Sequence, residues 1–107
     1  MKRVGILLKV KKEKIDAYRE VHKNVWPEMK AALNRQGWHN YSLFLTEDGQ
    51  LFGYFETPED LQTAQKGMEG ESINAKWQAE MGKYFESLEG KAADASMVEL
   101  EEVFHID

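Results

Sequence analysis

The sequence contains no cysteine, only two prolines and no apolar run long enough to cross a bilayer. Without cysteine the chain has no disulfides, no thiolate metal ligands and no cysteine nucleophile, so its stability and chemistry depend on other residues. Its start lacks the extended apolar core of a signal peptide. These absences predict a protein of the reducing cytoplasm that does not associate with membranes.

Positive charge is also in deficit. Lysine and arginine number 14 against 19 acidic residues, which gives a formal net charge of −5. A protein that neutralises the phosphates of a nucleic acid needs the opposite balance. Nucleic acid is therefore not an expected partner.

Motifs for several kinds of chemistry are missing as well. The chain has no glycine-rich phosphate loop, no G-x-S-x-G elbow and no dinucleotide fingerprint. His39 and His105 lie far apart, and no histidine pair or acidic cluster has metal-ligand spacing. We expect neither a metal nor an organic cofactor, so an enzyme of this sequence has to work with acid and base side chains.

The composition is that of one folded domain spanning 1–107, since 42% of the residues are hydrophobic and 31% are charged. Val4–Val10 is short and rich in aliphatic residues, which favours a strand. From residue 12 to 36 apolar residues recur at three- and four-residue steps, which predicts one long amphipathic helix. Pro27 lies inside it, so we expect a kink about one turn after His22.

A hairpin is predicted next, because Asp48-Gly49 separates the strand-like runs His39–Leu45 and Leu51–Glu56. A helix then follows, with Thr57 as its capping hydroxyl and Pro58 at its first position.

The glycines at positions 67 and 70 are expected to break that helix. A second helical stripe consists of Ile73, Trp77, Met81, Tyr84 and Leu88. A loop over 90–96 leads to a last strand, Val98–Ile106.

The element order βαββαβ predicts a ferredoxin-like α+β sheet with right-handed crossovers and both helical segments on one face. The other face would then expose a large apolar patch. Such a patch is covered by a second subunit or encloses a ligand, and the expected assembly is a homodimer.

Tyr18 and His22 are the first candidates for chemistry. They are four residues apart, so they share one helix face, and this face is the apolar one. An imidazole there is either a core histidine that bonds Tyr18 or a carbonyl, or a titratable acid and base lining a pocket. Tyr41 and Trp77 are candidates for packing on a sugar, although aromatic side chains in such positions more often belong to the core.

The segment from Tyr18 to Glu28 reads Y-x-x-x-H-x-x-x-W-P-E, and with it the chain resembles the L-rhamnose mutarotase family over nearly its whole length. Further similarities are Gly37–Ser42, Leu51–Tyr54 and Glu102–His105. The resemblance implies a dimeric α+β barrel that interconverts the anomers of a free aldose, L-rhamnose, without a cofactor. It also implies His22 as the proton donor, and Tyr18, Tyr41 and Trp77 as sugar-binding residues.

Two departures from the family pattern concern the substrate. Gln78 stands where the family has a second tryptophan, and residues 94–98 lack the usual N-S-P form. A glutamine can hydrogen-bond a hydroxyl that an indole only packs against, so we expect Gln78 to bind substrate. Two other functions fit the same fold: a dimeric module that binds a small ligand without turning it over, and a cofactor-free monooxygenase.

Overall fold

The structure is a computed structural model that describes residues 1–85 and 97–107. Its sheet has four strands, in the order β2-β3-β1-β4, and each neighbouring pair is antiparallel. The strands are β1 (Lys2–Lys9), β2 (His39–Leu45), β3 (Gln50–Thr57) and β4 (Val98–Leu100). With helices in both crossovers, this confirms the predicted ferredoxin-like α+β fold.

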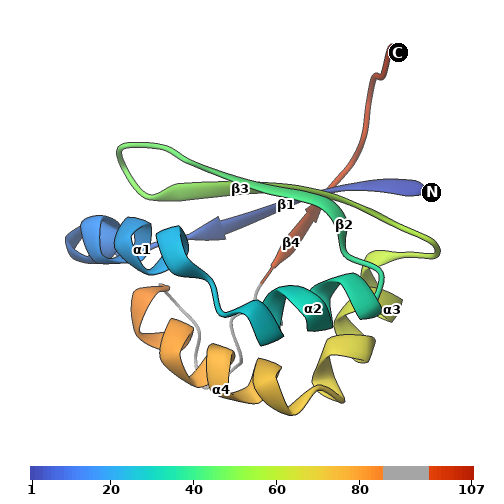
Figure 1. The fold of residues 1–107 in the computed structure, drawn as a ribbon. Helices are drawn as coiled ribbons and strands as arrows, with labels where there is room; N and C mark the ends of the chain where they lie inside the picture. Colours follow the sequence, from blue (N-terminus) through green and yellow to red (C-terminus); the bar gives the residue numbers. More distant parts are fainter. Residues whose placement is uncertain (86–96) are drawn as a thin grey trace.

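The helices all lie on one face of the sheet, and the C-terminal segment leaves on the opposite side (Figure 1). The first crossover contains the 3₁₀ turn Lys12–Lys14, α1 (Ile15–Val21), the 3₁₀ turn His22–Asn24 and α2 (Pro27–Arg35). The second contains α3 (Leu61–Glu69), α4 (Ser72–Met81) and the 3₁₀ turn Gly82–Tyr84.

The prediction of one kinked helix over 12–36 is wrong, because the helix is broken completely before Pro27. Val25 and Trp26 are extended, with ψ of 135° and 133°. The ring of a proline disfavours helical backbone in the residue before it. Pro27 itself starts α2 at a position where its missing N–H costs nothing. As a result His22 lies at the end of α1, and not in the middle of a helix.

The cap of α3 also differs from the prediction. Thr57 is the last residue of β3 and is buried, while the carboxylate of Asp60 accepts a bond of 2.8 Å from the Thr63 N–H. Gly67 lies within α3, and Gly70 ends it as its C-cap.

The last strand is shorter than predicted, since it ends at Leu100 and residues 101–107 have no regular secondary structure. At the other end of the sheet, Val10 follows β1 as an isolated bridge to Phe85. Leu88 and the loop over 90–96 lie outside the described residues. The hairpin is confirmed, and Gly49 has the positive φ of 95° that its turn requires.

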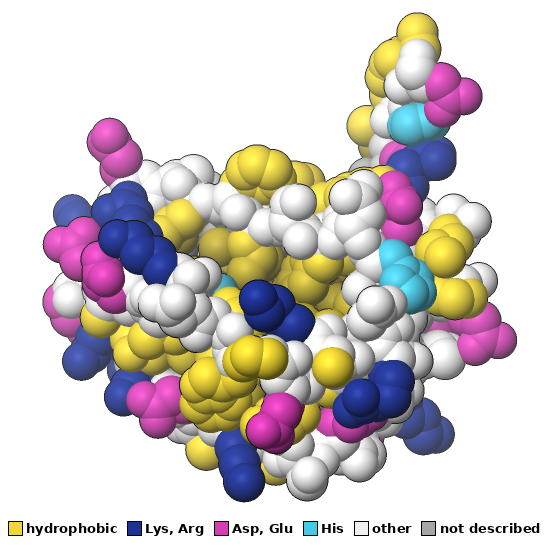
Figure 2. Space-filling model, in the orientation of Figure 1, with side chains coloured by type: hydrophobic (Ala, Val, Ile, Leu, Met, Phe, Trp, Pro, Cys, Tyr) yellow, Lys and Arg dark blue, Asp and Glu magenta, His cyan; other side chains and the backbone are white. Residues whose placement is uncertain are grey.

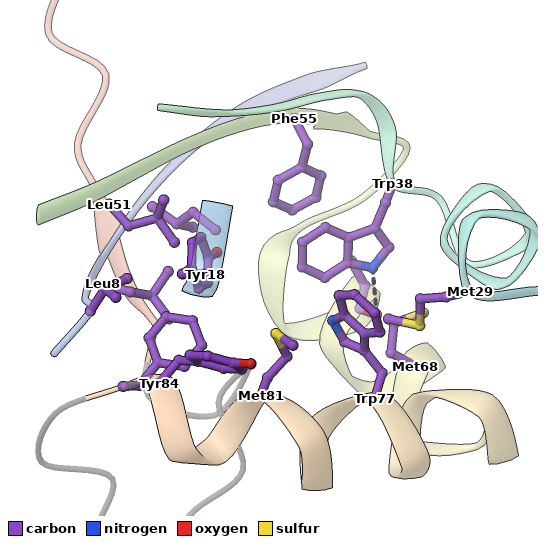
Figure 3. Packing of buried hydrophobic residues seen from close by; sticks show 14 of the residues in the cluster. Leu8, Tyr18, Met29, Trp38, Leu51, Phe55, Met68, Trp77, Met81 and Tyr84 are labelled. Carbon is purple, nitrogen blue, oxygen red and sulfur yellow. Dashed lines mark hydrogen bonds between the residues drawn. The ribbon is translucent and has the colours of Figure 1, made fainter. Parts of the chain in front are cut away.

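The hydrophobic core lies between the sheet and the helices (Figure 3). Alternation along β1 and β3 turns Ile6 and Phe55 toward the helices, and both are fully buried. Trp38 stacks on Phe55 with ring centroids 4.0 Å apart, and its indole N–H donates to the Ala64 carbonyl at 3.1 Å. This indole therefore joins the sheet to α3.

Gly53 in β3 provides a test of how tightly β1, β2 and β3 pack. A Cβ at this position would lie 2.8 Å from Cγ1 of Ile6 and 3.0 Å from Cδ2 of Leu43. Because Ile6 is fully buried, we expect Gly53→Ala to lower the free energy of unfolding by roughly 1–3 kcal/mol through overpacking. Urea denaturation followed by tryptophan fluorescence measures this change.

Gly5→Ala is the matched control. The added Cβ would lie 3.5 Å from the Phe52 ring and 3.7 Å from Cβ of Leu100, which is ordinary contact. We expect its free energy of unfolding to stay within about 1 kcal/mol of the wild type. Equal losses in the two variants would show that the interior face of the sheet is not packed as described.

Candidate active site

A cavity of about 490 Å³ lies between the inner face of the sheet and the helices. The five residues that the sequence predicts at a site, Tyr18, His22, Tyr41, Trp77 and Gln78, all lie on its wall. They come from α1, β2 and α4 and from the turn after α1. The structure therefore brings together residues that are up to 60 positions apart in sequence.

Most of the cavity wall is apolar. Leu8, Leu43 and Leu51 contribute from the sheet, and Met29 and Met81 from α2 and α4. Figure 2 shows hydrophobic side chains inside an opening in this face of the molecule, with a basic side chain at its rim. The few polar groups are thus placed against low-dielectric surroundings, where each one has a large effect on a bound molecule.

His22 is held in position by its own helix. Its Nδ1 lies 3.0 Å from the backbone carbonyl oxygen of Tyr18. A carbonyl only accepts hydrogen bonds, so Nδ1 carries a proton and Nε2 is the nitrogen that gains and loses one. The Tyr18 carbonyl also accepts the backbone N–H of His22, so both lone pairs of this oxygen are used at the end of α1.

Aromatic rings fix the imidazole further. The Tyr18 ring stacks on it at a centroid distance of 4.1 Å, and the Trp77 indole meets it edge to face at 5.6 Å. A carbonyl thus satisfies one nitrogen of His22, while the half-buried ring borders the cavity. Tyr18 orients His22 through its carbonyl and its ring face.

The surroundings shift the proton equilibria of both residues. Burial lowers the pKa of His22 below its ordinary value of 6.5, against the opposing effect of the bond to the Tyr18 carbonyl. Burial also raises the pKa of the Tyr18 phenol, and the nearby Tyr41 adds to this effect. At neutral pH the cavity therefore presents a neutral imidazole base next to a phenol that keeps its proton.

The α4 side of the cavity combines an indole with two amides. Trp77 also meets Trp26 edge to face at 5.0 Å, and Figure 3 shows it projecting from α4 toward Trp38. The Gln78 amide nitrogen donates to the Asn74 amide oxygen at 3.2 Å. Asn74 also lines the cavity and is 5% exposed. Sequence reasoning missed Asn74, although its spacing from Trp77 and Gln78 places it on the same helix face.

Two further lining residues were also not predicted as site residues. Lys30 on α2 lines the cavity. When His22 is neutral, Lys30 is the one charged side chain among the described lining residues. Met97, in the sequence stretch that departs from the family pattern, lines the cavity as well, whereas residues 94–96 are outside the described part. Across 1–85 and 97–107 no group of three His, Asp or Glu side chains could hold a metal ion. No helix in these residues is long and apolar enough to span a membrane.

A model of the L-rhamnose mutarotase family matches residues 3–106. The chain belongs to the L-rhamnose mutarotase family. An L-rhamnose mutarotase of Oceanobacillus iheyensis is 40% identical over 110 residues, and one of Lactiplantibacillus plantarum is 37% identical over 110 residues; each alignment covers 100% of both chains. The crystal structure of an L-rhamnose mutarotase from Formosa agariphila has a TM-score of 0.77 and 30% identity, and the match covers 100% of both chains.

In this family member the titration of His22 tests the geometry directly. Because burial disfavours the imidazolium, we expect the pKa of His22, followed by ¹H–¹³C NMR of the imidazole, to lie below 6.5. The unfolded chain then binds the proton more tightly than the folded one. The free energy of unfolding should therefore be fully retained above pH 6.5 and decrease as the pH falls toward the folded pKa.

The matched variant is His22→Asn, which removes the titrating group. Its free energy of unfolding in urea should depend less on pH between 7.5 and 5 than that of the wild type. A His22 pKa above 6.5, or equal pH dependence in both proteins, would contradict the placement of this ring in a buried wall.

Proposed function

We propose that this protein interconverts the α and β anomers of a free aldose, L-rhamnose, with His22 as its acid and base. The observation that carries the proposal is the His22 imidazole, locked by the Tyr18 carbonyl so that Nε2 is its exchanging nitrogen, at the wall of an aromatic-lined cavity. The family and the names of the relatives support the same activity and substrate. We assign it to a single domain that spans 1–107.

Ring opening needs two proton transfers, one at each of the two oxygens that are bonded to C1. Neutral His22 takes the proton of the anomeric hydroxyl as the C1=O bond forms and the bond from C1 to the ring oxygen breaks. The imidazolium then returns that proton to the ring oxygen, which gives the open-chain aldehyde. Rotation about C1–C2 and the reverse steps close the ring on the other face. Both oxygens are attached to C1 before opening, so one nitrogen can serve both. An imidazole suits this task because it can alternate between base and acid near neutral pH.

The other predicted residues act as substrate contacts in this proposal. The faces of Trp77 and Tyr41 pack on the C–H surface of the sugar. The Tyr18 phenol, which keeps its proton, donates to a sugar oxygen, and Gln78 binds a hydroxyl. Their common location on one cavity wall supports these roles.

His22→Ala should abolish most of the catalysis. A positioned acid and base contributes ~10²–10⁴-fold, so we expect kcat for anomer exchange of L-rhamnose to fall by about that factor. Saturation-transfer NMR between the two anomeric signals measures the exchange rate with and without enzyme. The wild-type rate should also fall as the pH drops through the pKa of His22, because the base is then protonated.

His39→Ala is the control. His39 lines a second hollow, together with Thr57 and Pro58, and does not line the main cavity. It should keep the wild-type rate. Full exchange in His22→Ala would refute the assignment of the proton shuttle. Sugar binding without any acceleration by the wild type would instead indicate a binding module, and oxygen uptake with a quinol would indicate a monooxygenase.

We also propose that the protein is a homodimer whose subunits pack through the outer face of the sheet. Phe44 and Phe52 point away from the helices, with rings 6.2 Å apart and 59% and 41% exposed. Val98 and Leu100 pair with β1 on the same face and are exposed as well. An apolar sheet face of this kind is normally covered by protein.

The C-terminal segment supports the same arrangement. It leaves the sheet on the outer side (Figure 1), and its apolar side chains Val103, Phe104 and Ile106 are exposed. Its base is attached to the subunit by Arg3, which donates two hydrogen bonds to Glu102, at 2.8 and 3.0 Å. A second copy of the chain is the occupant that would bury both the sheet face and this segment.

The cysteine-free composition supports a cytoplasmic location for the protein.

Phe52→Lys should dissociate the dimer, because it places a charge in the middle of the apolar sheet face. Sedimentation equilibrium should give twice the chain mass for the wild type and the chain mass for this variant. Lys76→Met, on the exposed side of α4, is the control and should remain dimeric. A monomeric wild type at micromolar concentration would refute this interface.

A further inference from the structure

We infer that the amides of Asn74 and Gln78 form a hydroxyl-recognition site that selects aldoses by the hydroxyls on the ring carbons opposite the anomeric carbon. This inference rests on the proposed function and extends it to the recognition of the substrate. The two side chains lie one turn apart on α4, both line the cavity, and the Gln78 nitrogen donates to the Asn74 oxygen at 3.2 Å.

The polar groups of the cavity come from two elements. His22 follows α1, and its ring meets the Trp77 indole edge to face at 5.6 Å. The two amides belong to the same helix as Trp77 and lie three residues before it and one residue after it. A pyranose with its C1 oxygens at His22 has its C3 and C4 hydroxyls farthest from that ring, and these are the hydroxyls that we assign to the amides.

Paired amides are well matched to sugar hydroxyls. Each hydroxyl both donates and accepts, and an amide presents N–H donors and a carbonyl acceptor in one plane. The bond between Gln78 and Asn74 holds the Gln78 amide in a defined orientation, and Asn74, at 5% exposed, has little room to move. The site is thus ordered before a sugar arrives, which lowers the entropy lost on binding.

The surrounding wall makes these amides decisive for selectivity. They share the cavity wall with Met68, Met81 and Leu33, which offer no hydrogen bonds to a sugar. An aldose that lacks the recognised hydroxyl would leave the amides without the contact that the normal substrate makes, a loss that apolar contact does not replace. The substrate class is accordingly free aldopyranoses with hydroxyls at both C3 and C4.

The test compares the activity of the wild type and two variants on three sugars. Anomer exchange is measured by NMR for L-rhamnose and for its 3-deoxy and 4-deoxy analogues, with the wild type, Gln78→Met and Asn74→Leu. In the wild type we expect kcat/KM to fall about 3- to 10-fold when the recognised hydroxyl is removed, as one hydrogen bond is lost. Gln78→Met, which keeps length and volume, should lose a similar factor on L-rhamnose and show no further loss on that analogue.

Lys76→Met is the matched control on the same helix, because Lys76 is exposed on the side away from the cavity. It should keep the wild-type ratio between L-rhamnose and the deoxy sugars. A purely structural role for the amides predicts that Gln78→Met lowers kcat/KM equally for all three sugars, and this result would overturn the inference. Gln78→Met remains informative if Asn74→Leu fails to fold.

The two proposals fail separately. If the wild type accelerates exchange but its preference among the three sugars is unchanged in Gln78→Met, the function stands and the amide site is refuted. If the wild type accelerates no exchange, the proposed function is refuted, and calorimetric binding of the same sugars to the same variants tests the amide site. Absence of both exchange and binding refutes both.

Discussion

The end of α1 at His22 is the constraint on which the site depends. Pro27 has no N–H and forces Trp26 into extended backbone, so one continuous helix through this segment is impossible. α1 ends at Val21, and Nδ1 of the next residue, His22, bonds the Tyr18 carbonyl oxygen. The Tyr18 carbonyl accepts the backbone N–H of His22 as well as its Nδ1, and the two bonds use both lone pairs of the oxygen. The bond to this carbonyl therefore determines which nitrogen of His22 keeps its proton.

The one-sided arrangement of helices on the sheet supplies the rest of the environment. The inner face provides both the core around Trp38 and Phe55 and the apolar wall of the cavity. Low polarity in that wall explains the opposite pKa shifts of His22 and Tyr18, since burial disfavours the imidazolium and the phenolate alike. The same arrangement leaves Phe44 and Phe52 exposed on the other face of the sheet, so the architecture that creates the cavity also creates the proposed dimer surface.

Within the family, this chain keeps the histidine of the Y-x-x-x-H-x-x-x-W-P-E motif and differs at another residue of the cavity wall. Gln78 takes the place of an indole, and it is bonded to an asparagine that is almost fully buried. In the proposed mechanism, exchanging an aromatic surface for amides leaves proton transfer to His22, because His22 follows α1 and the amides belong to α4. The proposals thus assign the reaction to α1 with its following turn, and substrate selection to α4.

The sequence by itself determined the order of the elements, the hairpin at Gly49, the family and the five residues now found on the cavity wall. These follow from local periodicity, from turn chemistry and from the family resemblance, whose strongest motif is Tyr18–Glu28. Only the tertiary structure decided that the first helix is broken, that Asp60 and not Thr57 caps α3, that the last strand stops at Leu100 and that Asn74 joins Gln78. Periodicity continues across a break when apolar residues on both sides face the same core, so the pattern over 12–36 could not reveal it. Partners distant in sequence, such as α4 and the sheet on either side of the cavity, meet only when the chain packs.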